Sequence, residues 1–87
     1  MYVILVYDIE EERVNKVCKY LRRYLNWTQN SVFEGEITPA RLEKLKVGLK
    51  KIMDEEMDSV YIYKLREERW MEKEIMGQAK HLPERII

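Results

Sequence analysis

Asp8 is the residue with the clearest potential for chemistry, because it ends an apolar run of strand length at residues 2–7. A carboxylate at a strand end can bind Mg²⁺, which takes oxygen ligands and often uses only one or two carboxylates in proteins. Such an ion can organise an attacking water and neutralise charge on a phosphodiester. One aspartate per chain is a poor site by itself. The alternative is structural, since Asp8 and Glu11 have the spacing of a capping box at a helix start.

Few other residues offer reactive chemistry. Ser31 could donate a hydrogen bond to a phosphate or a metal-bound water, or satisfy its own backbone, and no base is placed to make it a nucleophile. Cys18 is the only cysteine, which excludes an internal disulfide, and its place on an apolar stripe predicts packing. His81 has no second ligand at the spacing of a zinc site, and the three glycines form no phosphate loop.

Positive charge is concentrated in the middle of the chain. The sequence has 16 basic and 16 acidic residues and a net charge of zero, which argues against a general nucleic-acid binder. Residues 11–51, however, hold ten basic and five acidic residues, so this stretch is +5 and the remainder is −5. A charged helix face is often only solvated, and that is the alternative to phosphate binding. The candidate phosphate-binding residues are Arg13, Lys16, Lys19, Arg22, Arg23, Arg41 and Lys44.

The pattern of apolar residues predicts the elements that must position these groups. Residues 2–7 form a continuous apolar, β-branched run, which indicates a strand in the middle of a sheet with both faces covered. Beyond Asp8, apolar residues recur at the spacing of one helix face. That face consists of Val14, Val17, Cys18, Leu21, Tyr24 and Leu25. Residues 29–37 are then expected to be extended, in one or two strands, with Gly35 at a bulge or bend.

A second helix and a last strand complete the pattern. Thr38 and Pro39 form a strong helix start, with a threonine cap before a proline at the first helical position. The apolar face of this helix consists of Leu42, Leu45, Leu49, Ile52 and Met53. Residues 59–65 alternate like a strand. Val60 and Ile62 lie on one side of this strand, and Tyr61, Tyr63 and Leu65 on the other.

This order predicts one α+β domain over residues 1–87, a ferredoxin-like βαββαβ arrangement with two helices on one face of an antiparallel sheet. Residues 67–76 could be helical or extended, and Gly77 ends them. Residues 82–87 could form a short edge strand, since Pro83 bars them from a sheet centre. The apolar run at residues 2–7 is far too short to span a bilayer and no signal peptide is visible, which predicts a cytoplasmic protein with no membrane partner.

Two segments add a resemblance to this reading of the residues. Val-Tyr-Asp-Ile at residues 6–9 and Gln-Asn-Ser-Val-Phe-Glu-Gly-Glu-Ile-Thr at residues 29–38 resemble the signature segments of the small CRISPR-associated ferredoxin-like family. Chain length, element order and the helix start at Thr38 agree with that family. The first segment alone is weak, because apolar strands ending in aspartate are common, whereas the second is specific. The resemblance covers nearly the whole chain.

The resemblance implies a fold, partners and an activity. It implies a homodimer whose sheets face one another, with a C-terminal strand exchanged into the partner's sheet, so that residues 66–87 form an extension for dimerisation and partner docking. It implies a role in CRISPR spacer acquisition, as a bridge between two integrase homodimers in a heterohexamer-type complex that holds the incoming DNA. It also implies an endonuclease that cleaves single-stranded RNA or double-stranded DNA and depends on Mg²⁺, with Mn²⁺ as the alternative cofactor.

The resemblance also implies particular site residues. Two Asp8 carboxylates would meet at the dimer axis and share the metal. Tyr7 and Phe33 match family positions near the active site, although a core or interface position is the alternative for both. Trp27 and Thr28 stand where some family members have a basic residue just before the Gln-x-Ser-Val-Phe motif. This departure predicts a weaker grip on phosphate there.

Three other functions remain as alternatives. A stand-alone, toxin-like endoribonuclease would share Asp8 but have no integrase partner. A ligand-sensing module of the same ferredoxin-like topology usually needs a glycine in the first strand-to-helix turn, where this chain has Ile-Glu-Glu-Glu at residues 9–12. An RNA-recognition sheet would need the exposed aromatic motif with its Lys/Arg-Gly-Phe pattern, which this sequence lacks.

Overall fold

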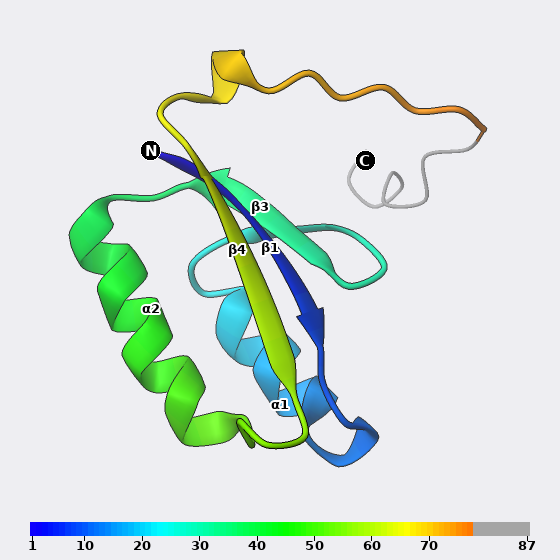
Figure 1. Cartoon of the computed structure of the whole chain (residues 1–87), viewed down its shortest axis with the longest axis vertical. Helices are drawn as coiled ribbons and strands as arrows, with labels where there is room; N and C mark the ends of the chain where they lie inside the picture. The colour runs from blue at the N-terminus through cyan, green and yellow to red at the C-terminus, as the bar shows by residue number, and fades with distance from the viewer. Residues whose placement is uncertain (78–87) are drawn as a thin grey trace.

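The computed structural model describes residues 1–77 as two helices packed on one face of a four-stranded antiparallel sheet (Figure 1). The elements in chain order are β1 (Tyr2–Asp8), α1 (Glu11–Leu21), β2 (Asn26–Gln29), β3 (Val32–Glu36), α2 (Pro39–Ile52), β4 (Ser59–Leu65) and a short 3₁₀ turn (Glu68–Trp70). The strands are ordered β2-β3-β1-β4, so β1 is central. The predicted ferredoxin-like α+β fold is therefore confirmed. The edge strand expected at residues 82–87 lies outside the described residues.

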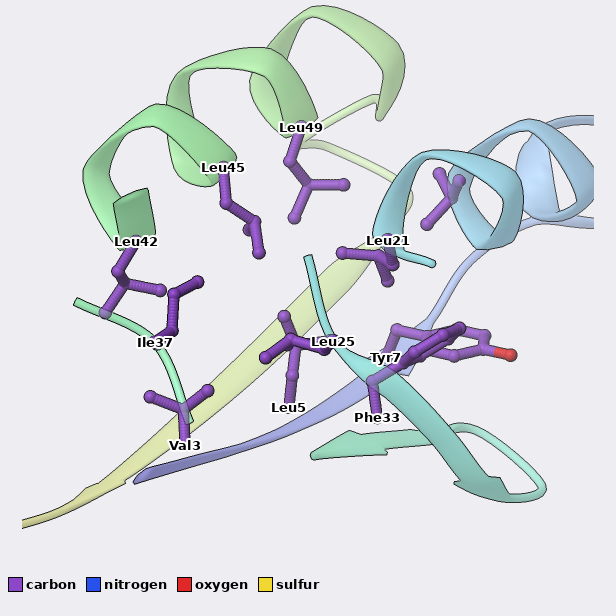
Figure 2. Packing of buried hydrophobic residues seen from close by; sticks show 11 residues of the cluster. Val3, Leu5, Tyr7, Leu21, Leu25, Phe33, Ile37, Leu42, Leu45 and Leu49 are labelled. Carbon is purple, nitrogen blue, oxygen red and sulfur yellow. The ribbon is translucent and has the colours of Figure 1, made fainter. Parts of the chain in front are cut away.

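The hydrophobic core lies between the sheet and the two helices. Alternate residues of β1, namely Val3, Leu5 and Tyr7, point toward the helix layer (Figure 2). They pack against fully or nearly fully buried side chains from β3, α1, α2 and the short segments that follow α1 and β3. These partners are Val17, Leu21, Leu25, Phe33, Ile37, Leu42, Leu45 and Leu49. Each such side chain contributes about 1.5–3 kcal/mol when it leaves water. This layer holds the sheet in place and fixes which residues of β1 face away from it.

The opposite face of the sheet carries no helix in the part of the chain that the structure describes. Val6 pairs with Val32 of β3 and Tyr61 of β4, and Ile4 pairs with Tyr63. Because directly paired residues share a face, these five side chains form an apolar surface, called here the helix-free face. Glu34, which also pairs with Ile4, lies at one end of it, where its carboxylate accepts the Tyr2 hydroxyl and contacts Lys73. Tyr61 and Tyr63 are 59% and 56% exposed. The first strand is central as predicted, but within residues 1–77 only one of its faces is covered by a second layer.

Both helices start near the predicted positions, and the first is shorter than expected. Thr38 caps α2, with its hydroxyl accepting the N–H of Arg41 at 3.2 Å. The apolar spacing in α1 predicts a helix as far as Leu25, but α1 ends at Leu21. The N–H of Leu25 still donates to the Leu21 carbonyl at 2.9 Å, which closes a turn. Leu25 therefore reaches the core from this turn rather than from a helix.

The segment between the helices is a hairpin whose irregular position differs from the expected one. The turn lies at residues 30–31, where Asn30 has a φ of 37°. Asparagine tolerates this left-handed conformation better than most residues. The register shifts between Trp27 and Gln29, so the bulge is in β2. The prediction of a bulge or bend at Gly35 is wrong, because Gly35 pairs regularly with Val3. Gly35 is needed for packing instead, because a Cβ there would lie 3.2 Å from the Leu25 side chain.

Candidate active site and basic helix surface

Asp8 is the exposed last residue of the central strand. It pairs with Ser59 at the start of β4. Since side chains alternate along a strand, Asp8 lies on the same side as Val6, at the end of the helix-free face. Within residues 1–77 its carboxylate makes no hydrogen bond or ion pair. The capping-box alternative is wrong, because the N-cap of α1 is Glu10 and no side chain closes a cap there.

A metal ion at Asp8 would need further ligands. Among residues 1–77, no group of three or more histidine, cysteine or acidic side chains is placed to hold a metal ion. Within these residues Asp8 is therefore not part of such a cluster. The exposed carboxylate of Asp8 has the right chemistry for one oxygen ligand in a site that two chains share.

Tyr7 and Phe33 lie on the other side of the sheet from Asp8. Both are buried in the core, with ring centroids 6.0 Å apart. The Tyr7 hydroxyl lies 3.1 Å from the Cys18 sulfur and donates to the Asn30 carbonyl at 3.4 Å. Burial and the hydrogen bond to Cys18 raise the pKa of Tyr7 to about 12. The neutral phenol therefore serves the core, and the structure does not bring Tyr7 or Phe33 together with the Asp8 carboxylate.

Ser31 is at the same end of the sheet as Asp8. Its backbone carbonyl accepts the N–H of Tyr7 at 3.0 Å, so the β2–β3 turn lies beside the end of β1. The neighbouring Asn30 carbonyl also accepts the indole N–H of Trp27 at 2.9 Å. This turn is held mainly through backbone carbonyls. The half-buried Ser31 side chain makes a hydrogen bond with the Tyr7 phenol that works against the rise in the pKa of Tyr7, so the structure places the Ser31 hydroxyl with Tyr7 and not beside the Asp8 carboxylate.

Arg13 is held by Asp58, a carboxylate that no sequence pattern singles out. Its guanidinium donates to both oxygens of Asp58, at 2.7 and 2.9 Å, and a third nitrogen lies 3.2 Å from Glu12. The Asp58 side chain is fully buried (0% exposed). The hydrogen bonds from Arg13 hold the pKa of Asp58 well below its usual range. Arg13 was a candidate phosphate-binding residue, but here its guanidinium is already occupied.

Five of the other basic candidates gather on the outer side of the helices, and we call them the basic helix surface: Lys16, Lys19, Arg23, Arg41 and Lys44. The first three line a hollow of about 400 Å³ together with Tyr20 and Ile52. Aromatic rings support the two arginines, with Arg23 over Tyr20 at 5.6 Å and Arg41 over Tyr24 at 4.6 Å. Such cation–π contacts orient a guanidinium while leaving its edge available to an anion.

Of the two candidate phosphate-binding residues Arg41 and Arg22, only Arg41 belongs to the basic helix surface. Arg41 also donates to the backbone carbonyl of Arg23 at 3.3 Å, which links the ends of the two helices. Arg22 is exposed at the C-cap of α1 and is not part of the basic helix surface. Burial and Cys18 raise the pKa of Tyr7, and the positive charge of Arg22 works against this rise. The helix layer covers the sheet face opposite to Asp8 (Figure 1). In a single chain, the basic helix surface and Asp8 are therefore separate sites on opposite sides of the sheet.

Together the fold and these surfaces define a class of protein, a small ferredoxin-like domain with an exposed carboxylate at the end of its central strand. Comparison with known proteins narrows the class. A family model described as CRISPR associated protein Cas2 matches residues 1–73. The chain belongs to this Cas2 family.

Two relatives are similar to this chain in sequence along its whole length. A protein of Pyrococcus furiosus named CRISPR-associated endoribonuclease Cas2 is 58% identical over 87 residues, which is all of both chains. A protein of the same name from Thermococcus kodakarensis is 52% identical, again over all of both chains. Among solved structures, one titled as the crystal structure of Cas2 has a TM-score of 0.84 and 49% identity, and covers 92% of this chain and 90% of that one. Streptococcus pyogenes Cas2 at pH 6.5 has a TM-score of 0.78 and 35% identity, with 88% and 100% covered.

None of the helices within residues 1–77 has the length and apolar character needed to cross a bilayer.

Proposed function

We propose that this chain is a homodimeric, metal-dependent endonuclease that acts on nucleic acid in CRISPR spacer acquisition. The observation that carries the proposal is the position of Asp8, an exposed carboxylate at the end of the apolar helix-free face. A second copy that covers this face would bring another Asp8 to the same interface.

The helix-free face supports a homodimer. Its two most exposed side chains, Tyr61 and Tyr63, are amphipathic aromatics of the kind enriched at protein interfaces. A chain of 87 residues buries only about 60% of its unfolded surface, so covering an apolar sheet face adds stability that such a small domain needs. The family resemblance independently implies sheets that face one another.

Two chains supply what one chain lacks. A pair of Asp8 carboxylates forms an oxygen donor set that suits Mg²⁺ or Mn²⁺, which keep several waters when bound. A bound ion would supply an activated water and charge neutralisation for phosphodiester hydrolysis. The protein's own part is to hold the two carboxylates at fixed strand ends.

Nucleic acid is the substrate class that fits the charge distribution. The basic helix surface presents five basic side chains on each chain. RNA is the first substrate to test, since the P. furiosus and T. kodakarensis relatives are named endoribonucleases. Double-stranded DNA is the second. Because Asp8 and the basic helix surface face opposite ways in one chain, we propose that the basic surface holds nucleic acid for assembly rather than for cleavage.

The resemblance to the CRISPR-associated family supports the proposed role in spacer acquisition. We propose that the dimer bridges two integrase homodimers and that its basic helix surface holds the incoming DNA between them. Residues 66–87 are proposed to dock the integrase and to exchange a strand between protomers.

One comparison tests the proposed function. Wild-type protein and Asp8→Asn are incubated with single-stranded RNA and with double-stranded DNA, with Mg²⁺ and with a chelator, and Glu36→Gln serves as a control at an exposed carboxylate of β3. We expect cleavage that requires Mg²⁺ and is lost only in Asp8→Asn. Equal cleavage by Asp8→Asn would show that the metal assignment is wrong. Co-purification with the integrase and a spacer-integration assay of Asp8→Ala separate the scaffold role from the nuclease.

A further inference from the structure

Asp58 joins three segments of the chain at the end of the sheet that carries Asp8. One of its oxygens accepts the backbone N–H of Glu10 at 2.8 Å, and the other accepts that of Asp54 at 2.8 Å. The Arg13 guanidinium donates to both oxygens, at 2.7 and 2.9 Å. The carboxylate is therefore saturated with donors, although its side chain is fully buried (0% exposed). We call this set of contacts the Asp58 clamp.

The Asp58 clamp holds the chain next to both members of the strand pair formed by Asp8 and Ser59. Asp58 directly precedes Ser59, and Ser59 is the residue that pairs with Asp8 across β1 and β4. Glu10 follows Asp8 by two residues, so its bound N–H fixes the chain just after the carboxylate leaves the strand. Both sides of the pair are thus tied to one buried group. A buried carboxylate of this kind depends on its cation, because removal of one partner leaves the other charged and unpaired.

We propose that Asp58 and Arg13 are a positioning pair that fixes the direction in which the Asp8 carboxylate points. The consequence for catalysis rests on the proposed function, in which Asp8 would help to hold a metal ion at the reacting phosphate. Neither member of the pair touches substrate, and Arg13 serves the protein's own backbone instead of a phosphate. Misplacing a reacting group by about 1 Å can cost about 100-fold in rate, so loss of the clamp acts on turnover.

Kinetics distinguish positioning from phosphate binding. In Asp58→Asn and Arg13→Lys we expect kcat to fall about tenfold or more while KM stays within about twofold, because only the orientation of Asp8 has changed. If Arg13 instead holds a phosphate, Arg13→Lys raises KM with kcat unchanged, and Arg13→Gln reduces the salt dependence of binding by about one unit of slope. Glu56→Gln, in the same turn as the clamp, is the matched control and should leave both constants unchanged.

Amide hydrogen exchange measured by NMR tests the clamp without any cleavage assay. In Asp58→Asn we expect the amides of Glu10 and Asp54 to exchange about tenfold faster or more, since each loses a hydrogen bond to a charged group. The amide of Leu5 in the sheet centre should keep its protection, which shows that the domain is still folded. If Asp58→Asn does not fold, Arg13→Lys provides the same comparison with the carboxylate retained.

The kinetics and the amide exchange rates distinguish a failure of the proposed nuclease from a failure of the Asp58 clamp. If wild-type protein cleaves neither RNA nor DNA, the proposed nuclease fails, and the exchange rates of Glu10 and Asp54 still decide whether the clamp exists. Unchanged protection of both amides in both variants would overturn the clamp. Lost protection with an unchanged kcat would overturn the positioning role, because Asp8 would then keep its orientation without Asp58.

Discussion

The hydroxyl of Tyr20 in α1 lies directly over Gly48 in α2. It donates to the backbone carbonyls of Lys44 and Leu45, at 3.2 and 3.1 Å, beside the point where the two helices meet. A Cβ on Gly48 would lie 2.6 Å from the ring carbon that carries the hydroxyl, and closer still to the oxygen itself. The missing side chain at Gly48 therefore lets Tyr20 join the helices that together form the basic helix surface.

Gly48→Ala should destabilise the protein although it removes a glycine from a helix. At an ordinary exposed helix position the change stabilises by about 1 kcal/mol. Here the tyrosine ring must swing away and lose its two hydrogen bonds, and we expect a net loss of about 1–3 kcal/mol. Chemical denaturation measures the change. In a Tyr20→Ala background the same substitution should become neutral or stabilising, and an equal loss there would contradict the contact.

Tyr61→Lys should separate the two protomers of the proposed homodimer without unfolding either. The Tyr61 side chain is 59% exposed in the single chain, so the fold of that chain does not depend on this side chain. Placing a lysine in the centre of an apolar interface should weaken dimerisation at least about tenfold. Sedimentation velocity across a concentration series measures this. Val47→Lys on α2 is the control, because Val47 is 58% exposed but lies away from the helix-free face. A dimer that survives Tyr61→Lys would place the interface elsewhere.

Substitutions on the basic helix surface should change the salt dependence of nucleic-acid binding. Each phosphate contact that is lost lowers the slope of log K against log salt by about 1. We expect Lys16→Gln and Lys19→Gln to do so and Lys64→Gln on β4 to leave the slope unchanged. Binding titrations at several salt concentrations measure it. Equal slopes in all variants would show that the surface is merely solvated.

Acid should destabilise the wild-type protein through Asp58. Hydrogen bonds from Arg13 hold the pKa of Asp58 below its usual range in the folded state. A free aspartate titrates near pH 3.9. The unfolded chain therefore takes up this proton first, so the contribution of Asp58 is complete above about pH 4 and is lost as the pH falls further. Thermal unfolding between pH 7 and pH 3 should show a steeper decline for wild type than for Asp58→Asn. Parallel curves would contradict it.

Much of the fold could be predicted because local patterns carry it. The cap at Thr38, the apolar periodicity of both helices and the alternation of β4 each depend on neighbouring residues, and all three are confirmed. The end of α1 was missed because Leu25 is buried from a turn, and apolar spacing alone does not distinguish a helix from a turn that follows it. Gly35 was assigned to a bulge, whereas it makes room for the side chain of Leu25.

The site could be predicted only in part, because some of its contacts join residues that are far apart in the sequence. The position of Asp8 follows from the strand that it ends. Asp58, in contrast, accepts hydrogen bonds from Arg13 and Glu10, which precede it in the sequence by 45 and 48 positions. No local pattern distinguishes it from a surface acid. The same long-range contact removes Arg13 from the residues available to a phosphate. Tyr7 and Phe33 match family motifs, but only the packing of the sheet on the helices shows that both rings face inward.

The proposed metal site requires two chains to meet with their Asp8 carboxylates together. A short thiol-to-thiol cross-linker tests this with Asp8→Cys in a Cys18→Ser background, which removes the one native cysteine. Lys19→Cys in the same background is the control on the basic helix surface. We expect rapid covalent dimers from Asp8→Cys and none from Lys19→Cys at equal protein concentration. Uncross-linked single chains from Asp8→Cys, with dimers from Lys19→Cys, would contradict the proposed site.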